Sequence, residues 1–384
     1  MHPIVEYLRT NSVASLEARG IYARWSTVHP EKFSLNYDQI EASSDDPLAC
    51  ECRGLVLVQE SRERGEPGRY RVVAQPFRRF FNLGQPGAAE IDWATAAFQE
   101  KMDGTLCIVY WHGGVWNVAT RSVPDADIAN NDGRTFADRF WAARDIATTL
   151  LMAGSENAGL TWLFEFTAPD NQIVIPYEAE RLTLLAAFRT ETGEEVQPCG
   201  TVVEGSDGVA RPRSWRFGGP AEAARWVNEQ PGIALEGLVI VDGNGARVKV
   251  KNSQYLAVAS VMTSAGSDRG LVSLILHGTA DDARAYLPAV RQARLDELAE
   301  GVRRWAVEID ADATTAKALL PDRKAAALAI QATPRAGWIG TILDVATGKA
   351  ANASEWVAKR RGADGVLMPS LVEKIAAAAG GVVA

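Results

Sequence analysis

The sequence predicts an α+β fold, in which antiparallel β-sheets with a few helices are followed by an all-α C-terminal region. Two observations predict it. Up to about residue 255, β-rich runs alternate with turn residues, and His112-Gly113-Gly114 and Asp242-Gly243-Asn244-Gly245 are typical of tight antiparallel hairpins. After Tyr255, alanine-rich segments with helical spacing dominate and strand signals nearly vanish. A chain of 384 residues is also long for a single core, so we expect two domains, 1–257 and 258–384.

The expected strands are short runs rich in β-branched, aromatic and aliphatic residues, bounded by turn residues. In chain order they cover residues 52–59, 69–74, 105–111, 115–120, 160–167, 181–189, 235–241 and 246–251. The third and fourth, and the last two, flank the glycine-containing turns and should therefore pair as hairpins.

The expected helices have apolar residues three or four positions apart. Between residues 134 and 152, Phe136, Phe140 and Ala143 fall on one face, and Pro288 suits the first turn of a helix because no backbone N–H is needed there. The expected helices cover residues 134–152, 220–228, 281–286, 288–307, 314–320, 323–331, 354–359 and 372–379.

Composition indicates a globular, cytoplasmic protein with no membrane segment. Hydrophobic residues make up 47% and charged residues 23%. No apolar run approaches the roughly 18 residues of a membrane span, and the N-terminus lacks the layout of a signal peptide. The four cysteines form no disulfide framework, and Cys50-x-Cys52 is too tight for a normal zinc pair and has no companion pair.

The net charge of −8 counts mildly against a broad nucleic-acid-binding face. From residue 261 onward, 15 basic residues balance 14 acidic ones, whereas the preceding part has 25 basic and 34 acidic residues. Any basic groove in the N-terminal part must therefore be assembled from particular residues.

The tetrapeptide Lys101-Met102-Asp103-Gly104 lies at the start of the expected strand 105–111. A lysine amine attacks phosphorus or carbonyl carbon only when unprotonated, so a nucleophilic lysine needs neighbours that depress its pKa. Asp-Gly is also a favoured turn pair, and Lys-x-Asp-Gly alone describes many exposed turns. Taken alone, the tetrapeptide favours a turn.

The hairpin around residue 244 gives a clearer geometry. Because side chains alternate along a strand, Lys249 and Lys251 should share one face while Val248 and Val250 occupy the other. Glu236 lies across the hairpin, so two ammonium groups and a carboxylate should be close. Taken alone, this arrangement also describes a solvated face with weak ion pairs.

The order of six short segments is far more specific than any one of them: Arg53-Gly54, Phe80-Phe81-Asn82, Lys101 to Gly104, Phe164-Glu165-Phe166, Glu236-Gly237 and Lys249-Val250-Lys251. Over residues 45 to 255 this order resembles the covalent nucleotidyltransferase superfamily of ATP-dependent ligases and capping enzymes. It is most similar to the RNA ligase 1 family, whose archetype is the T-even phage enzyme that repairs cleaved tRNA.

The resemblance implies a nucleotidyltransferase (adenylyltransferase) domain at residues 1–257. In this family the lysine matching Lys101 attacks the α-phosphate of ATP and carries AMP. AMP then moves to the 5′-phosphate of an RNA, and a 3′-hydroxyl displaces it to form a phosphodiester. The resemblance implies a monomer that repairs RNA, including nicked tRNA, with residues 258–384 selecting the substrate.

The resemblance also assigns roles to residues. Lys249 and Lys251 would contact the α-phosphate, and Glu165 and Glu236 would contact ribose or hold Mg²⁺ or Mn²⁺. Asp103 would orient the lysine or bind the metal. The remaining expected nucleotide-binding residues are Arg53, Arg79, Phe81, Gly104, Arg121, Gly237 and Tyr255.

Two positions depart from the family pattern. Arg79 and Arg121 stand where a lysine is expected. Arginine keeps the positive charge but differs from lysine in geometry and hydration, so the replacement is not neutral. Both positions are expected to contact the polyphosphate.

Other functions remain open. The chain could join another polynucleotide, or cap RNA with a guanylate, although capping enzymes usually append an OB-fold domain and the C-terminal region looks helical. It could also be a non-catalytic RNA-binding relative or adenylate sensor, although intact Lys101, Glu236, Lys249 and Lys251 argue against that.

Overall fold

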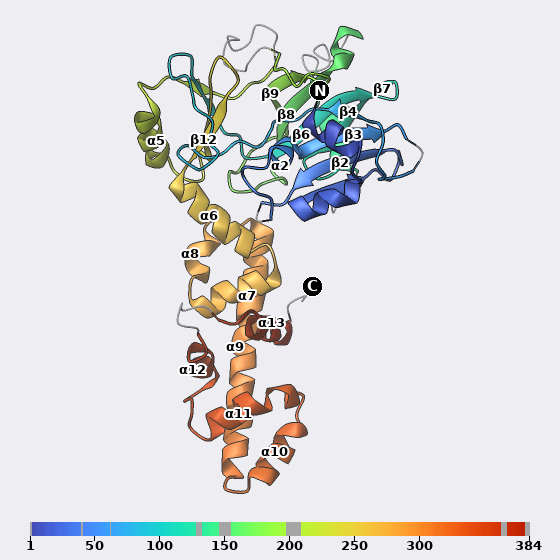
Figure 1. Ribbon diagram of the computed structural model, residues 1–384. Helices are drawn as coiled ribbons and strands as arrows, with labels where there is room; N and C mark the ends of the chain where they lie inside the picture. The colour runs from blue at the N-terminus through green and yellow to red at the C-terminus, as the bar shows by residue number, and fades with distance from the viewer. Residues whose placement is uncertain are drawn as a thin grey trace. The chain divides into compact units, whose positions relative to one another are not determined.

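Figure 1 presents a computed structural model of the chain, which describes residues 2–39, 41–61, 63–127, 133–145, 155–196, 209–361 and 367–380. The chain divides into two compact units, Met1–Leu256 and Ala257–Ala384. The division lies one residue before the expected boundary. The α+β class, with antiparallel sheets first and helices after, is confirmed.

The N-terminal unit contains three antiparallel sheets of four strands each within the described residues, with strand orders β1-β2-β3-β4, β7-β6-β8-β9 and β10-β5-β11-β12. We refer to them as the first, second and third sheets. Their strands are β1 (Ile21–Trp25), β2 (Lys32–Tyr37), β3 (Arg53–Gln59), β4 (Tyr70–Ala74), β5 (Ala97–Glu100), β6 (Thr105–His112), β7 (Val115–Thr120), β8 (Leu160–Thr167), β9 (Arg181–Arg189), β10 (Ser214–Trp215), β11 (Gly237–Val241) and β12 (Arg247–Lys251).

The first and second sheets pack on both faces, which explains why strands such as β3 and β8 are nearly continuous apolar runs in the sequence. Val56 and Val73 of the first sheet pack against Ile108 and Leu163 of the second. The helices of this unit are α1 (Pro3–Leu8), α2 (Pro47–Glu51), α3 (Phe136–Ala143) and α5 (Pro220–Glu229). Phe140 of α3 belongs to the core on the other side of the second sheet. The expected helix 134–152 begins as predicted, and residues 146–152 lie outside the described part.

The third sheet has one buried and one functional face. Val227 of α5 packs on Leu238, Ile240 and Val248, and Figure 1 shows α5 beside β12. Because side chains alternate along strands, Val239 and the odd-numbered residues of β12 face the other way. The site described below lies on that other face.

Both predicted hairpins are confirmed. His112 pairs with Val115 around Gly113 and Gly114, whose φ angles of +64° and +83° suit the two central positions of a tight hairpin turn. In the second hairpin, Asp242 closes the loop before β12 by accepting hydrogen bonds from two backbone amides.

Lys101 does not simply precede a strand. It directly follows β5, and residues 101–104 connect the third sheet to β6 of the second. No local pattern predicted β5, because its residues Ala-Phe-Gln-Glu have weak strand propensity. Its pairing with β10 and β11 makes it a strand.

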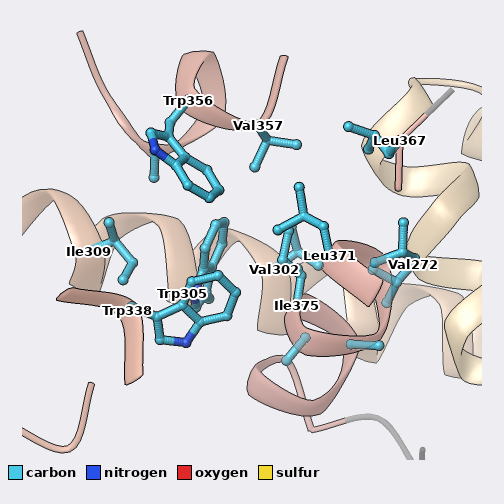
Figure 2. Close-up of a cluster of buried hydrophobic side chains, with 14 of the residues drawn as sticks. Val272, Val302, Trp305, Ile309, Trp338, Trp356, Val357, Leu367, Leu371 and Ile375 are labelled. Atoms are coloured by element: carbon cyan, nitrogen blue, oxygen red, sulfur yellow. The ribbon is translucent and has the colours of Figure 1, made fainter. Parts of the chain in front are cut away.

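The described part of the C-terminal unit consists of helices and their connections, with one isolated antiparallel bridge between Arg361 and Leu367. Its helices are α7 (Asp268–His277), α8 (Ala280–Arg284), α9 (Ala289–Ala318), α10 (Arg323–Gln331), α11 (Ile339–Ala346), α12 (Ala353–Ala358) and α13 (Pro369–Ala378), and α6 (Ser253–Ser264) joins the two units. Figure 2 shows its core, in which Trp305, Trp338 and Trp356 lie among aliphatic side chains.

The expectation of separate helices at 288–307 and 314–320 was wrong, because α9 is a single helix of 30 residues. The intervening residues contain no proline or glycine, and Ile309 and Ala313 continue the buried stripe begun by Leu298 and Trp305. Among the described residues, no helix is long and apolar enough to cross a membrane.

Candidate functional site

The site is centred on one carboxylate shared by two lysines. The backbone N–H of Lys101 donates to the carbonyl of Gly237 at 2.9 Å, which extends the pairing of β5 with β11. The Nζ atoms of Lys101 and Lys251 lie 2.8 Å and 2.9 Å from the same Oε1 of Glu236. Glu236 is only 3% exposed, so these ion pairs are largely shielded from water.

Two glycines make this close packing feasible. A Cβ on Gly237 would lie 2.0 Å from the carbonyl oxygen of Val250, and a Cβ on Gly104 would lie 2.3 Å from that of Phe166. With no side chain in the way, the N–H of Gly104 donates to Glu165 Oε1 at 3.1 Å. Both glycines therefore serve the site by allowing backbone contact.

The predicted shared face of β12 is confirmed, and it carries three cations. Arg247, Lys249 and Lys251 are half-buried and alternate with buried valines. Sequence reasoning missed Arg247, although the same alternation could have found it. Burial, together with the charges of Lys251 and Lys101, lowers the pKa of Lys249 to about 8.

The Phe-Phe-Asn segment lies along the edge of β12. Lys249 N donates to the carbonyl of Phe81 at 3.0 Å, and its own carbonyl accepts from Leu83 N at 2.9 Å. The Lys249 ammonium is 5.5 Å from the centroid of the Phe80 ring. This segment thus fixes the lysine at the middle of the cationic row.

Glu165 is the second carboxylate of the site. Burial raises the pKa of Glu165 to about 7, and the nearby charge of Glu236 adds to the rise, while Lys101 and Arg53 oppose it. Two close carboxylates with nearby cations are suited to a divalent metal or to ribose hydroxyls.

Arg53 has a buried N–H group that is suited to bind an anion. Its Nη1 atom is buried and has no hydrogen-bond partner among the described residues. Burial lowers the pKa of Arg53, and the positive charge of Arg121 adds to this effect. A buried N–H without an acceptor is costly, so a phosphate oxygen at this point would satisfy it.

The two arginines that depart from the family pattern lie against Tyr37, a buried residue that no sequence signal identified. The guanidinium of Arg79 is 4.5 Å and that of Arg121 4.8 Å from the centroid of the Tyr37 ring. Arg121 also donates to Asn36 at 3.0 Å. Planar guanidinium groups can stack on an aromatic ring in this way, whereas lysine cannot.

Asp103 is engaged by the protein on both oxygens. One accepts from the backbone amides of Val174 and Ile175 at 2.9 and 2.8 Å, and the other accepts from the hydroxyl of Tyr255 at 2.6 Å. It is 1% exposed, and both oxygens already have partners within the protein. These contacts fit the orienting role expected of Asp103, and its metal role stays a prediction. Tyr255 reaches the site through Asp103.

A cavity opens beside Lys101 on this face of the third sheet. Its apolar walls include Phe77, Phe80, Leu185 and Val239, and Arg53, Glu165 and Arg247 supply charge. Sequence reasoning placed Phe80 in a family segment but gave none of these four apolar residues a role in the site. A planar base fits such apolar walls, with polar groups fixing its orientation. Phe81 lies outside this lining and instead borders an adjoining hollow with Arg79.

Comparisons with known proteins identify the family of this chain. A family model described as RNA ligase matches residues 51–255. A protein of Autographa californica nuclear polyhedrosis virus, provisionally named as a bifunctional polynucleotide kinase/RNA ligase, is 27% identical over 67% of this chain and 38% of its own length. A protein of Thermovibrio ammonificans, provisionally named RNA ligase, is 30% identical over 65% of this chain and 64% of its own.

The chain thus spans less than two thirds of the length of either relative. Among solved structures, an archaeal ATP-dependent RNA ligase is 16% identical over 74% of both chains with a TM-score of 0.39, which is too low to carry an argument. The family model covers more than half of the chain and contains every residue of the site described above except Asn36 and Tyr37. The chain belongs to the RNA ligase family, of the RNA ligase 1 type.

Proposed function

We propose that this protein is an ATP-dependent RNA ligase that joins a 5′-phosphate end to a 3′-hydroxyl end through an AMP carried on Lys101. The observation that carries the proposal is the placement of the Lys101 amine on a buried carboxylate that also binds Lys251. This cluster lies beside an apolar cavity and within the residues matched by the family model.

In the first step, Lys101 Nζ attacks the α-phosphorus of ATP. An N–P bond forms, the bond to the pyrophosphate oxygen breaks, and the amine loses its proton. Glu236 lies 2.8 Å from this nitrogen and is the carboxylate within reach of that proton. Lys249, Lys251 and Arg53 oppose the negative charge that develops on the phosphate oxygens.

In the second step, an oxygen of the RNA 5′-phosphate attacks the same phosphorus and releases Lys101 as an amine. In the third, the 3′-hydroxyl oxygen of the other RNA end attacks the 5′-phosphorus, and AMP leaves. Each step exchanges one phosphorus bond for another, so the energy of ATP reaches the RNA end through the covalent carrier.

Glu165 and Glu236 fit a divalent metal, Mg²⁺ or Mn²⁺. Hard cations bind carboxylate oxygens, and Mg²⁺ in phosphoryl-transfer sites commonly uses one or two carboxylates together with substrate phosphates. Among the described residues there is no group of three or more His, Cys, Asp or Glu side chains that could hold an ion alone. When bound, the metal would neutralise charge on the phosphates.

The first test is transfer of radioactive AMP from α-labelled ATP to the protein, read on a denaturing gel. Lys101→Arg is the decisive variant because it keeps a cation beside Glu236 but removes the nucleophilic amine. We expect labelled wild-type protein and no label on the variant. If no divalent metal supports labelling, the enzymatic function is refuted. A preference for GTP would indicate a capping enzyme. Equal labelling of Lys101→Arg would refute Lys101 as the nucleophile.

The helical unit we assign to selection of the RNA, including nicked tRNA. Its described core is built from its own residues, which is compatible with a role separate from AMP transfer. A chain ending at residue 266, after α6, should still accept AMP on Lys101 but should lose the preference for structured RNA ends. Loss of AMP transfer in a soluble truncated protein contradicts this assignment.

A further inference from the structure

A second hollow adjoins the cavity beside Lys101 and has no part in the steps above. Three segments of the N-terminal unit form most of it: Gln75–Phe81, Gly193–Glu195 and Gly243–Arg247, the last without Ala246. Gly87, Ala89 and Phe188 complete the lining. It shares Phe77, Phe80 and Arg247 with the cavity beside Lys101. A group in the hollow would therefore lie next to the nucleotide.

Two buried acceptor atoms at this hollow lack hydrogen-bond partners among the described residues. Glu195 accepts from Arg247 Nη2 on Oε1 at 2.5 Å, while its buried Oε2 accepts nothing. Gln75 donates from Nε2 to the carbonyl of Pro76 at 2.8 Å, while its buried Oε1 is unpaired. The Glu195 side chain is 8% exposed and Gln75 is 3% exposed. Because an unpaired buried acceptor is costly, both atoms favour a ligand with N–H donors.

Both unpaired atoms lie beside glycines that line the hollow. A Cβ on Gly245 would lie 3.5 Å from Glu195 Oε2, and a Cβ on Gly193 would lie 3.8 Å from Gln75 Oε1. Neither glycine carries a side chain that could cover its acceptor, and their φ angles of +82° and +71° favour glycine at these positions.

The remaining walls suit a flat, apolar ring attached to a phosphate. Phe77, Phe81 and Phe188 line the hollow, and Arg78 and Arg79 add positive charge. Aromatic rings stack on nucleobases of single-stranded RNA, and arginines hold the backbone phosphates. Aromatic walls, cations and unpaired acceptors together describe a site for a nucleobase that donates hydrogen bonds.

We propose that this hollow binds an unpaired RNA base bearing an exocyclic amino group, with Glu195 and Gln75 as the acceptors. The proposal rests on the proposed function for the choice of RNA as ligand. Adenine, cytosine and guanine carry such an amine. Hypoxanthine and uracil place a carbonyl oxygen there instead, which would face the carboxylate of Glu195 and leave both acceptors unsatisfied.

Matched RNA pairs test this in the wild-type protein. Binding of fluorescent 5′-phosphorylated hexamers is measured by anisotropy, comparing cytidine with uridine and adenosine with inosine. We expect the amine-bearing member of each pair to bind about 10-fold more tightly, as for loss of a hydrogen bond to a charged group. Equal binding within both pairs overturns the proposal.

Variants locate the effect. Glu195→Gln and Gln75→Leu should each reduce the discrimination to less than about 3-fold by removing one acceptor. Glu191→Gln removes the same charge from an exposed residue of the same turn, outside the lining, and should retain the full discrimination. Discrimination that persists in both hollow variants assigns it to another surface and overturns the proposal.

The base of ATP is the alternative source of the amino group. A non-hydrolysable ATP analogue at saturation should leave the preference for cytidine over uridine intact, whereas loss of that preference would assign the hollow to ATP and overturn the RNA assignment. Because binding is measured without catalysis, the outcome is independent of AMP transfer. If the protein discriminates between the bases but does not accept AMP, the ligase function is refuted and the base site stands. If it accepts AMP but does not discriminate between the bases, only the base site is refuted.

Discussion

The two units of the chain satisfy their buried polar groups to different degrees. Among the described residues, the N-terminal unit leaves six buried side-chain atoms without partners: those of Arg53, Gln75 and Glu195 at the site or beside it, and those of Asp125, Arg139 and Trp162 away from it. In the described part of the helical unit, the corresponding buried atom is only the indole nitrogen of Trp305. Unpaired buried polar groups are costly, so the N-terminal unit gives up more stability in this way than the helical unit does, and the three atoms at the site are those that a ligand there could satisfy.

Among substitutions that keep Lys101, Glu236→Ala should produce the largest effect on AMP transfer. Removing the carboxylate leaves Lys101 and Lys251 close together with no shared counter-ion, and breaking a buried pair in this way costs about 3–5 kcal/mol. We expect AMP transfer to Lys101 to slow by roughly 10²–10³-fold. Single-turnover labelling checks this, with the exposed Glu229→Gln as the charge-matched control. A change of less than 10-fold would show that the pairs are not used.

Gly301→Ala should lower the stability of the helical unit without changing the chemistry of the N-terminal unit. Its Cβ would lie 2.1 Å from the carbonyl oxygen of Ala379, so α9 and α13 must move apart. Overpacking of this kind costs about 1–3 kcal/mol. We expect a lower melting temperature and normal AMP transfer. Gly340→Ala in α11 has open space around its Cβ and should instead stabilise by about 0.5–1 kcal/mol, because alanine is the better helix former.

Tyr255→Phe tests the link from α6 to the Lys101 segment. The change leaves one oxygen of buried Asp103 without a donor, at a cost of about 1–3 kcal/mol. Both stability and AMP transfer should fall, the latter by about 10-fold if Asp103 positions the lysine. Tyr286→Phe, on the exposed surface of the helical unit, is the control. Lower stability with unchanged AMP transfer would reduce Tyr255 to a structural role.

The smallest expected effect is the pH dependence of AMP transfer at the N-terminal site. The raised pKa of Glu165, about 7, means that it is neutral and a poor metal ligand below that pH. The lowered pKa of Lys249, about 8, means that it loses its charge above that pH. The kcat/KM for AMP transfer should therefore rise to about pH 7 and fall above about pH 8. Lys249→Arg should remove the alkaline fall, because arginine stays charged.

Much of the site could be predicted from the sequence, because its elements are local. The glycine turns at 113–114 and 243–245 determine the hairpins, and the period-two pattern places Lys249 and Lys251 on one face. The order of motifs identifies the family, which the family model confirms. Local patterns also failed in places: β5 has weak strand propensity, and α9 was divided where its polar residues merely face solvent.

The sequence by itself determined which side chains were available, which face of a strand they share and where the chain turns, because these follow from backbone geometry over a few residues. The tertiary structure decided which of them meet. Lys101 reaches Glu236 only because β5 pairs with β11. Asp103 is held by Val174, Ile175 and Tyr255, and Glu195, which forms an isolated bridge with Phe188 of β9, meets Arg247 of β12. Such contacts join residues far apart in the chain, and no local pattern encodes them.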